Sequence, residues 1–259
     1  MNLVRVGVIA RNVFLEVIRD RILYLVALFA VLMVVAVGLL PQVSAGAQDK
    51  IILDLGLAAI NLLSVVVAVF VGTGLVNKEI EKRTVLVLIA KPVSRLEFIV
   101  GKHLGLAAVL GVLIGLLSLI LLAVLALGGI SYPLGSLLLA ILFMFLEAVL
   151  VTAIALLFGV FTSSLLATLL TFALYLVGHL SQDIVALGKL SESAGVQRVT
   201  NALYLVLPDL ERLNLKNQAI YGMQLMPSTA ELGSHLLYAL LYTALLLAIA
   251  VGVFSRRQF

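Results

Sequence analysis

The chain contains no cysteine and no tryptophan among its 259 residues, and only 12% of those residues are charged. The lack of cysteine excludes a disulfide framework and any Cys-based zinc, iron–sulfur or redox site. The shortage of charge excludes a water-soluble domain, because a soluble chain carries charge on roughly a quarter of its positions. Hydrophobic residues make up 63% of the chain, and the mean hydropathy is +1.25. The sequence therefore predicts an integral membrane protein.

Catalytic motifs are also missing from the chain. It has neither a Gly-x-x-x-x-Gly-Lys-Ser/Thr loop to hold nucleotide phosphates nor a His-Glu-x-x-His zinc motif, and its three His residues are isolated. The pair Gly101-Lys102 is followed by His103 and an apolar run, so it does not form a phosphate loop. We therefore predict that the chain is not an enzyme, and we expect no nucleic-acid partner.

Six apolar runs without Lys or Arg are long enough to cross a hydrocarbon core of about 30 Å, which takes about 20 helical residues. We therefore expect an all-α integral membrane fold with six transmembrane helices in a single domain, residues 1–259. The first run stops at Pro41, and only three residues separate the fourth from the fifth. The six runs cover residues 22–40, 55–76, 104–127, 134–161, 165–180 and 235–254.

The distribution of Lys and Arg outside these runs predicts the orientation of the chain. If the N-terminus is cytoplasmic, twelve of the 17 Lys and Arg residues lie on the cytoplasmic side, as the positive-inside rule requires. Four of the other five lie in one long segment, residues 181–234, where the rule is weaker. We therefore expect both termini to be cytoplasmic and residues 181–234 to be extracytoplasmic.

The first 21 residues do not have the pattern of a cleaved signal, since the apolar run that follows them has 19 residues and a signal core has about 7 to 15. Arg5, Asn12, Glu16 and Arg19 recur at helical spacing, with Val residues between them. This pattern predicts an amphipathic helix in the inner headgroup layer. A plain basic flank to the first span is the alternative.

Residues 77–103 form the predicted cytoplasmic loop with the most informative sequence. Charges of both signs surround a short apolar stretch at 85–90, which Pro92 ends. Ser94 and Glu97 form a capping-box pattern, so a new helix is expected to begin there and to run into the third span. An ordinary solvated loop would show the same charge pattern, and that reading stays open.

Few polar residues lie within the predicted spans. Glu147 is at the middle of the fourth, where an ionised side chain costs several kcal/mol unless it is paired or protonated. Six such residues form a candidate translocation path, although hydrogen bonds between helices would also explain them and are the commoner reason for such residues. The path residues are Asn61, Ser64, Glu147, Thr171, Tyr175 and His179. The small residues of the third span, including Gly101, Gly105, Gly111 and Gly115, predict close helix packing.

The predicted outer segment, 181–234, is too long for a simple turn and is expected to fold over the outer mouth. Met223 and Met226, with His179 and His235, have the ligand types of a soft-metal site. We interpret them as scattered residues and predict no metal site.

Three stretches of the chain resemble the ABC type-2 permeases, in particular the copper-processing or multidrug-like subgroup. The opening Ala10-Arg-Asn-Val-Phe-Leu-Glu-Val-Ile-Arg-Asp-Arg-Ile-Leu-Tyr24 looks like the entry helix of that family. Residues 79–102 carry its Glu, Lys-Pro-Val-Ser-Arg and Gly-Lys pattern, with Thr84-Val85 in place of Gly-Thr-Leu. Residues 207–215, Leu-Pro-Asp-Leu-Glu-Arg-Leu-Asn-Leu, resemble the segment that the family places between spans five and six.

The resemblance implies the permease subunit of an ABC exporter in a cell inner membrane. Such a subunit forms a dimer with an identical or paralogous permease, contacts membrane lipids, and docks a separate cytoplasmic ATPase that binds ATP and Mg²⁺, so this chain needs no cofactor. Charged residues of the coupling loop would steer the ATPase, and apolar ones would supply buried area. The expected docking residues are Glu79, Glu81, Thr84, Leu86, Leu88, Lys91, Pro92, Ser94 and Arg95.

Two other functions stay open at the level of sequence. An ion-gradient-driven carrier would use Glu147 as a proton carrier, although the hydropathy shows no paired repeat of broken helices. A non-catalytic subunit of a larger membrane complex that holds haem would need His pairs at mid-depth. We place His103 at the inner edge of the membrane, and His179 and His235 at the outer edge.

Overall fold

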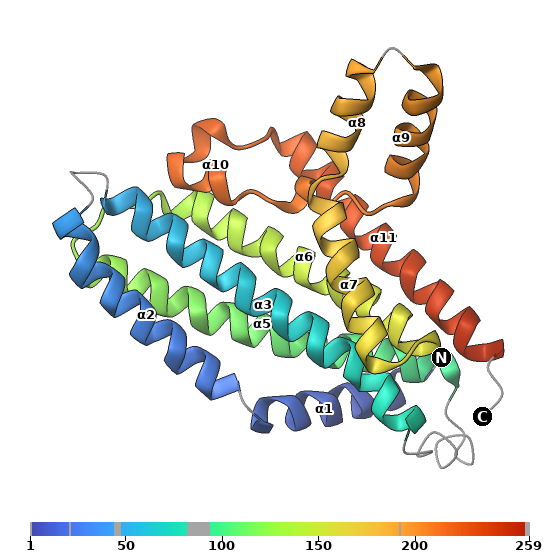
Figure 1. Ribbon diagram of the computed structural model, residues 1–259. Coiled ribbons are helices and arrows are strands. Elements are labelled where there is room, and N and C mark those ends of the chain that lie inside the picture. Colours follow the sequence, from blue (N-terminus) through green and yellow to red (C-terminus); the bar gives the residue numbers. More distant parts are fainter. Residues whose placement is uncertain (1, 21, 44–47, 82–93, 192, 257–259) are drawn as a thin grey trace.

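The computed structural model describes the chain apart from residues 1, 21, 44–47, 82–93, 192 and 257–259, and it describes no side chain at 20, 41–43, 78, 80 or 81 (Figure 1). The described part is built of helices and contains no strand. The long helices are α1 (Leu3–Asp20), α2 (Ile22–Val43), α3 (Gln48–Glu81), α5 (Arg95–Leu127), α6 (Leu134–Phe161), α7 (Ser164–His179) and α11 (Thr229–Arg256). Shorter elements join α7 to α11, namely α8 (Ser181–Leu190), α9 (Ala194–Val206), η1 (Glu211–Leu213), α10 (Lys216–Tyr221) and η2 (Met223–Leu225).

Five of these helices, α2, α3, α5, α6 and α11, are each long and apolar enough to cross a membrane. The fourth predicted span coincides with α6, whereas α3 and α5 extend beyond the predicted runs. The first predicted span has the bounds of the candidate span Ile22–Leu40, and the helix that contains it, α2, continues to Val43.

The fifth predicted span is not one straight helix. At 1.5 Å per residue, the 16 residues of α7 rise about 24 Å, which is less than a hydrocarbon core of about 30 Å. Together, α7 and α8 are long and apolar enough to cross a membrane, but the two helices are bent by 55° relative to each other. The carbonyl oxygen of Gly178 lies at the bend, where it accepts hydrogen bonds from Ser181 Oγ at 3.0 Å and from Leu210 N at 3.1 Å.

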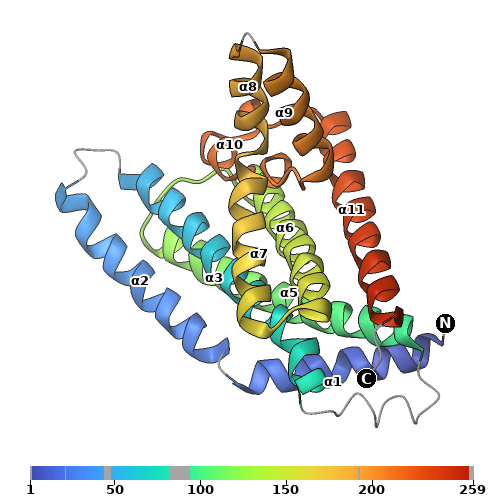
Figure 2. The same ribbon diagram turned by 45° about the vertical axis from the view of Figure 1, so that its right-hand side comes forward.

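The described helices form a tilted bundle with two distinct ends (Figure 1). The start of α1, the end of α3, the start of α5 and the end of α11 lie at one end, which we call the terminal end. The α8–α9 hairpin projects from the other, which we call the hairpin end (Figure 2). α6 packs against α3, α5, α7 and α11. In its apolar stretch 67% of the residues are buried, against 22% in those of α2 and of α11. α6 is therefore central, and α2 and α11 expose apolar side chains at the periphery.

Helix α5 begins where the capping box predicted. Ser94 Oγ accepts a hydrogen bond from Glu97 N at 3.2 Å, and Glu97 Oε2 accepts one from Ser94 N at 3.0 Å. The other oxygen of Glu97, Oε1, accepts a hydrogen bond from Asn2 N at 2.6 Å. One buried carboxylate therefore joins the starts of α1 and α5.

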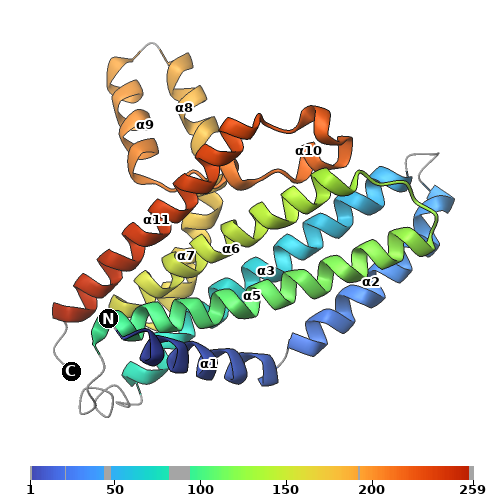
Figure 3. The ribbon, with the colours of Figure 1, turned by 180° about the vertical axis from the view of Figure 1, so that it is seen from behind.

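Helix α1 lies across the terminal end and packs along α5 (Figure 3). Its buried face contains Val6, Val13 and Val17. The close approach depends on glycine in α5, because a Cβ atom at Gly105 would lie 2.6 Å from the carbonyl oxygen of Ala10. The close helix packing predicted for the small residues of the third span is confirmed at Gly105.

We predict that Gly105→Ala lowers the melting temperature of the purified protein and separates α1 from α5. The backbone of α1 cannot yield to the added methyl group without losing contacts, and overpacking costs about 1–3 kcal/mol. The matched control is Gly115→Ala in the same helix, where an added Cβ meets nothing within 4 Å. That variant should keep or raise the melting temperature because alanine favours helix. Equal effects of the two substitutions would contradict the packing role of Gly105.

Candidate functional site

The two flanks of the candidate docking loop, the end of α3 and the start of α5, lie at the terminal end, but most of the loop itself falls outside the described residues. The structure gives side-chain positions for three of its nine predicted residues, Glu79, Ser94 and Arg95. It describes Glu81 only as the last residue of α3. The remaining predicted residues, Thr84, Leu86, Leu88, Lys91 and Pro92, belong to the part that is not described.

The three described residues hold the helix ends on both sides of the loop. Glu79 pairs with Lys102 of α5, Ser94 caps α5, and the Arg95 guanidinium donates a hydrogen bond to the carbonyl oxygen of Ser255 in α11. The sequence predicts Glu79 and Arg95 as residues that dock a partner protein, and it predicts no role for Lys102. In the structure, these three side chains join α3, α5 and α11.

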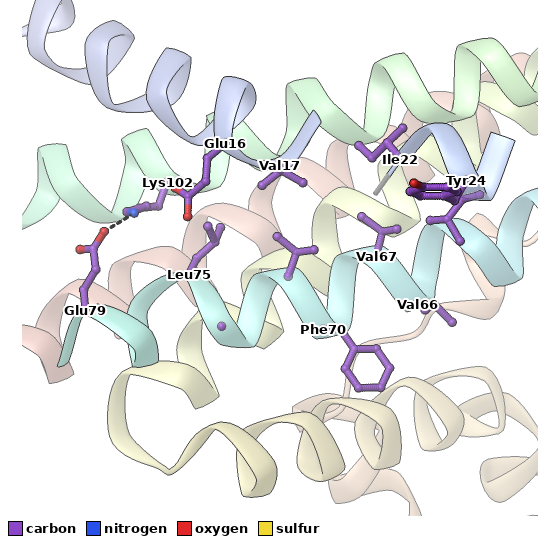
Figure 4. A pocket seen from close by; sticks show the side chains of 13 residues that line it. Glu16, Val17, Ile22, Tyr24, Val66, Val67, Phe70, Leu75, Glu79 and Lys102 are labelled. Atoms are coloured by element: carbon purple, nitrogen blue, oxygen red, sulfur yellow. Dashed lines mark hydrogen bonds and ion pairs between the residues drawn. The ribbon is translucent and has the colours of Figure 1, made fainter. Parts of the chain in front are cut away.

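A pocket of about 790 Å³ opens beside this end. Its walls come from α1, α2 and α3, and Lys102 of α5 contributes to its charged end (Figure 4). Most of the lining is apolar, including Val17, Ile22 and Phe70, but Glu16, Glu79 and Lys102 also face it. No sequence motif indicated this pocket.

A second polar cluster lies inside the bundle. Glu147 of α6 is fully buried, and its Oε1 atom lies 3.3 Å from Nε2 of His179 in α7. The rings of His179 and Tyr175 are 4.6 Å apart between centroids, and the Tyr175 side chain lies beside both Asn61 and Glu147. The structure therefore brings together four of the six predicted path residues, from three different helices.

The other two path residues make local hydrogen bonds. Ser64 Oγ donates to the carbonyl oxygen of Ile60 at 2.6 Å, and Thr171 Oγ1 donates to that of Ala167 at 2.7 Å. Both side chains are buried and hydrogen-bond to their own helices. Thr168, which like Thr171 is in α7, contacts another helix: its hydroxyl oxygen lies 3.0 Å from that of Thr73 in α3.

A third polar cluster lies at the hairpin end, around Asp209. Its carboxylate accepts hydrogen bonds from Arg212 Nε at 2.8 Å, Tyr204 Oη at 2.9 Å and Gln182 Nε2 at 3.1 Å. Its backbone N–H donates to Tyr238 Oη at 2.8 Å. The cluster thus connects α8, α9 and η1 with α11. Asp209 belongs to the 207–215 segment, but the sequence gave no sign of these contacts.

Burial would by itself raise the pKa of Asp209, but the hydrogen bonds from Arg212, Tyr204 and Gln182 outweigh it and hold the pKa below its usual value. A carboxyl group whose pKa is lowered on folding stabilises the fold above its unfolded pKa, about 3.9. That stabilisation is lost as the pH falls through the folded pKa. The connection between the hairpin and α11 is therefore sensitive to acid.

We predict that Asp209→Asn lowers the stability of the hairpin end by about 1–3 kcal/mol, because it removes the charge of a buried acceptor to which three side chains donate. Proteolysis of the α8–α9 hairpin should be faster in this variant at pH 7. The wild-type protein should approach the same rate in a pH series taken below about 4. Asp183→Asn, at an exposed carboxyl in α8, is the control and should not change cleavage. Unchanged cleavage of the Asp209 variant would contradict the role of this cluster.

We predict that His179→Leu destabilises the bundle more than the double substitution Glu147→Leu with His179→Leu. Removing one partner of a buried pair costs about 3–5 kcal/mol, whereas replacing both partners by apolar residues is often neutral. Melting temperatures of the two single variants and the double variant in detergent provide the measurement. Additive losses would mean that the two side chains do not interact.

Among the described residues, no group of three or more His, Asp or Glu side chains is placed to hold a metal ion.

Comparison with known proteins identifies the family to which the chain belongs. A search of the curated proteins finds no match. The family model for ABC-2 family transporter proteins matches residues 8–259, and this range includes the terminal-end contacts, the Glu147 cluster and the Asp209 cluster. The chain belongs to the ABC-2 transporter family.

Proposed function

We propose that this multi-pass membrane protein is the permease subunit of an ABC exporter and docks a separate ATPase. The observation that carries the proposal is the family match over residues 8–259. Proteins of this family are membrane components of transporters and normally work with an ABC ATPase. ATP and Mg²⁺ would then be bound by the partner, and this chain would convert closure of the ATPases into movement of its helices.

The proposal treats α7 and α8 as one broken crossing, which gives six crossings and places both termini on one side. The arrangement of the bundle supports this reading, since α1 and the last turn of α11 lie at the same end (Figure 3). The Lys and Arg distribution then assigns that end to the cytoplasm, α1 to the inner headgroup layer and the hairpin to the outer side. For a bacterial protein, this membrane is the inner membrane.

Docking is assigned to the segment 82–93 and its flanks. The Glu79–Lys102 pair, the cap at Ser94 and the Arg95–Ser255 contact support this assignment, because they tie both flanks of the segment to spanning helices. A force applied to the segment would reach α3, α5 and α11 together. Within the family, we assign the chain to the copper-processing or multidrug-like subgroup, and its Lys91-Pro-Val-Ser-Arg95 stretch supports that assignment.

Transport is assigned to a route that passes the Glu147 cluster in a dimer of two permeases, either identical or paralogous. A buried carboxyl group, an imidazole, a phenol and an amide from three helices, α6, α7 and α3, can exchange partners when those helices move. The cluster also favours a second candidate function, a carrier driven by an ion gradient in which Glu147 holds a proton. The two functions differ in whether transport follows ATP or the gradient.

We predict that the tagged protein, purified in mild detergent with a co-expressed ABC ATPase, forms a complex whose ATPase activity exceeds that of the ATPase alone. A Lys91→Glu, Leu88→Glu variant should lose the complex and the stimulation, because it reverses a charge and removes apolar contact area at the docking loop. The control is Lys50→Glu, a charge reversal at the hairpin end that should leave both unchanged. Arg95 is unsuitable for this test because it also bonds α11.

If no ATPase binds, or if the loop variant binds as well as the wild type, the docking proposal is wrong. Transport that follows a proton gradient and stops in Glu147→Gln would then favour the carrier. Glu147→Gln that blocks transport in an intact, ATP-hydrolysing complex would instead support the translocation path.

A further inference from the structure

The pocket at the terminal end has the shape and polarity of an amphiphile. Its volume, about 790 Å³, lies within the range of about 300–1,000 Å³ that is usual for small-molecule sites. The three charged side chains, Glu16, Glu79 and Lys102, gather at one end of it (Figure 4). Ile22 and Tyr24 lie at the other end, where the first turn of α2 faces α3 (Figure 4).

The apolar end is open to the hydrocarbon phase of a membrane. Tyr24 is 78% exposed and Phe70 is 58% exposed, although both line the pocket. Such side chains on a spanning helix contact lipid chains at no cost. A long acyl or alkyl chain can therefore enter sideways between α2 and α3 without crossing water.

Among the lining residues that the structure describes, two acids, Glu16 and Glu79, share this end of the pocket with one base, Lys102. Lys102 is only 7% exposed, and its ammonium group is paired with Glu79. Among the residues that the structure describes, the carboxylate of Glu16 makes no ion pair. A bound phosphate or carboxylate would meet two carboxylates and a lysine that is already paired. An ammonium group would instead gain the attraction of Glu16 and keep the Glu79–Lys102 pair intact.

We propose that this pocket binds an amphiphile with an ammonium head and a hydrocarbon tail, taken from the membrane leaflet at the terminal end. The head lies beside Glu16, and the tail runs along α2 and α3 towards the middle of the bundle. Because α1, α2 and α3 all form the walls, occupancy joins the surface helix to two spanning helices. The inference rests on membrane insertion and the fold, and not on docking of an ATPase.

The absence of tryptophan allows a direct test. Tyr24→Trp places a single fluorophore at the pocket, and Leu241→Trp places one on the exposed face of α11, where Leu241 is 62% exposed. Each protein is placed in nanodiscs of phosphatidylglycerol with a small share of one brominated guest, since bromine quenches tryptophan on contact. The guests are phosphatidylethanolamine, hexadecylamine, phosphatidylglycerol and hexadecanoic acid.

We expect the ammonium guests to quench the tryptophan at position 24 at roughly five-fold lower concentration than the anionic guests. This ratio of affinities is the one that a single ion pair in a partly exposed site provides. Glu16→Gln should abolish this difference, and Asp54→Asn, a carboxylate of α3 outside the pocket, should preserve it. Val71→Phe, which fills the pocket, should weaken quenching by every guest. The tryptophan at position 241 should not distinguish the guests.

The guests separate the two sources of the ligand. Preference for phosphatidylethanolamine assigns the site to a bilayer lipid, and preference for hexadecylamine alone assigns it to a free single-chain amine. Equal quenching by all guests at position 24, or a preference that survives Glu16→Gln, would overturn the proposal. Either result would leave the proposed docking of an ATPase untouched, because the experiment contains no ATPase.

Discussion

The absence of water from the membrane interior is the constraint on which the rest of this structure depends. A backbone N–H or C=O group that is left unpaired in hydrocarbon costs several kcal/mol, so a crossing segment must be a helix over its whole length. The five long apolar helices meet that condition internally. At the bend between α7 and α8, two groups satisfy a backbone carbonyl: Ser181 Oγ and the N–H of Leu210 donate hydrogen bonds to the Gly178 carbonyl oxygen.

The few polar side chains gather into three clusters, one at each end of the bundle and one inside it. The terminal end joins α3, α5 and α11 by an ion pair and a hydrogen bond that flank the segment 82–93. The hairpin end is joined to α11 by the contacts of Asp209. Between the two ends, Oε1 of the buried Glu147 side chain in α6 lies 3.3 Å from Nε2 of His179 in α7. A movement of α6 relative to α7 would therefore have to exchange the partner of a buried carboxylate.

Much of the fold follows from the sequence because hydropathy reports directly on the solvent. The bounds of α6 and the capped start of α5 were predictable from apolar length and from the Ser94–Glu97 spacing. The break after His179 was not predictable, since one of the two groups that bond the Gly178 carbonyl, the N–H of Leu210, comes from far along the chain. Glu147 and His179 stood out as polar residues in apolar runs, but their 3.3 Å contact depends on the packing of α6 against α7. The pocket beside Glu16 left no trace in the sequence, because three separate helices enclose it.

The account depends most on the broken α7–α8 segment being a true crossing that brings α11 back to the side of α1. Because the chain has no cysteine, single cysteines at Leu3, Gln197 and Ser255 can be labelled with a membrane-impermeant maleimide in sealed vesicles of known orientation. The account predicts that positions 3 and 255 are labelled from the cytoplasmic side and that position 197 is labelled only from the opposite side. Labelling of positions 3 and 255 from opposite sides would show five crossings and would contradict the permease architecture proposed here.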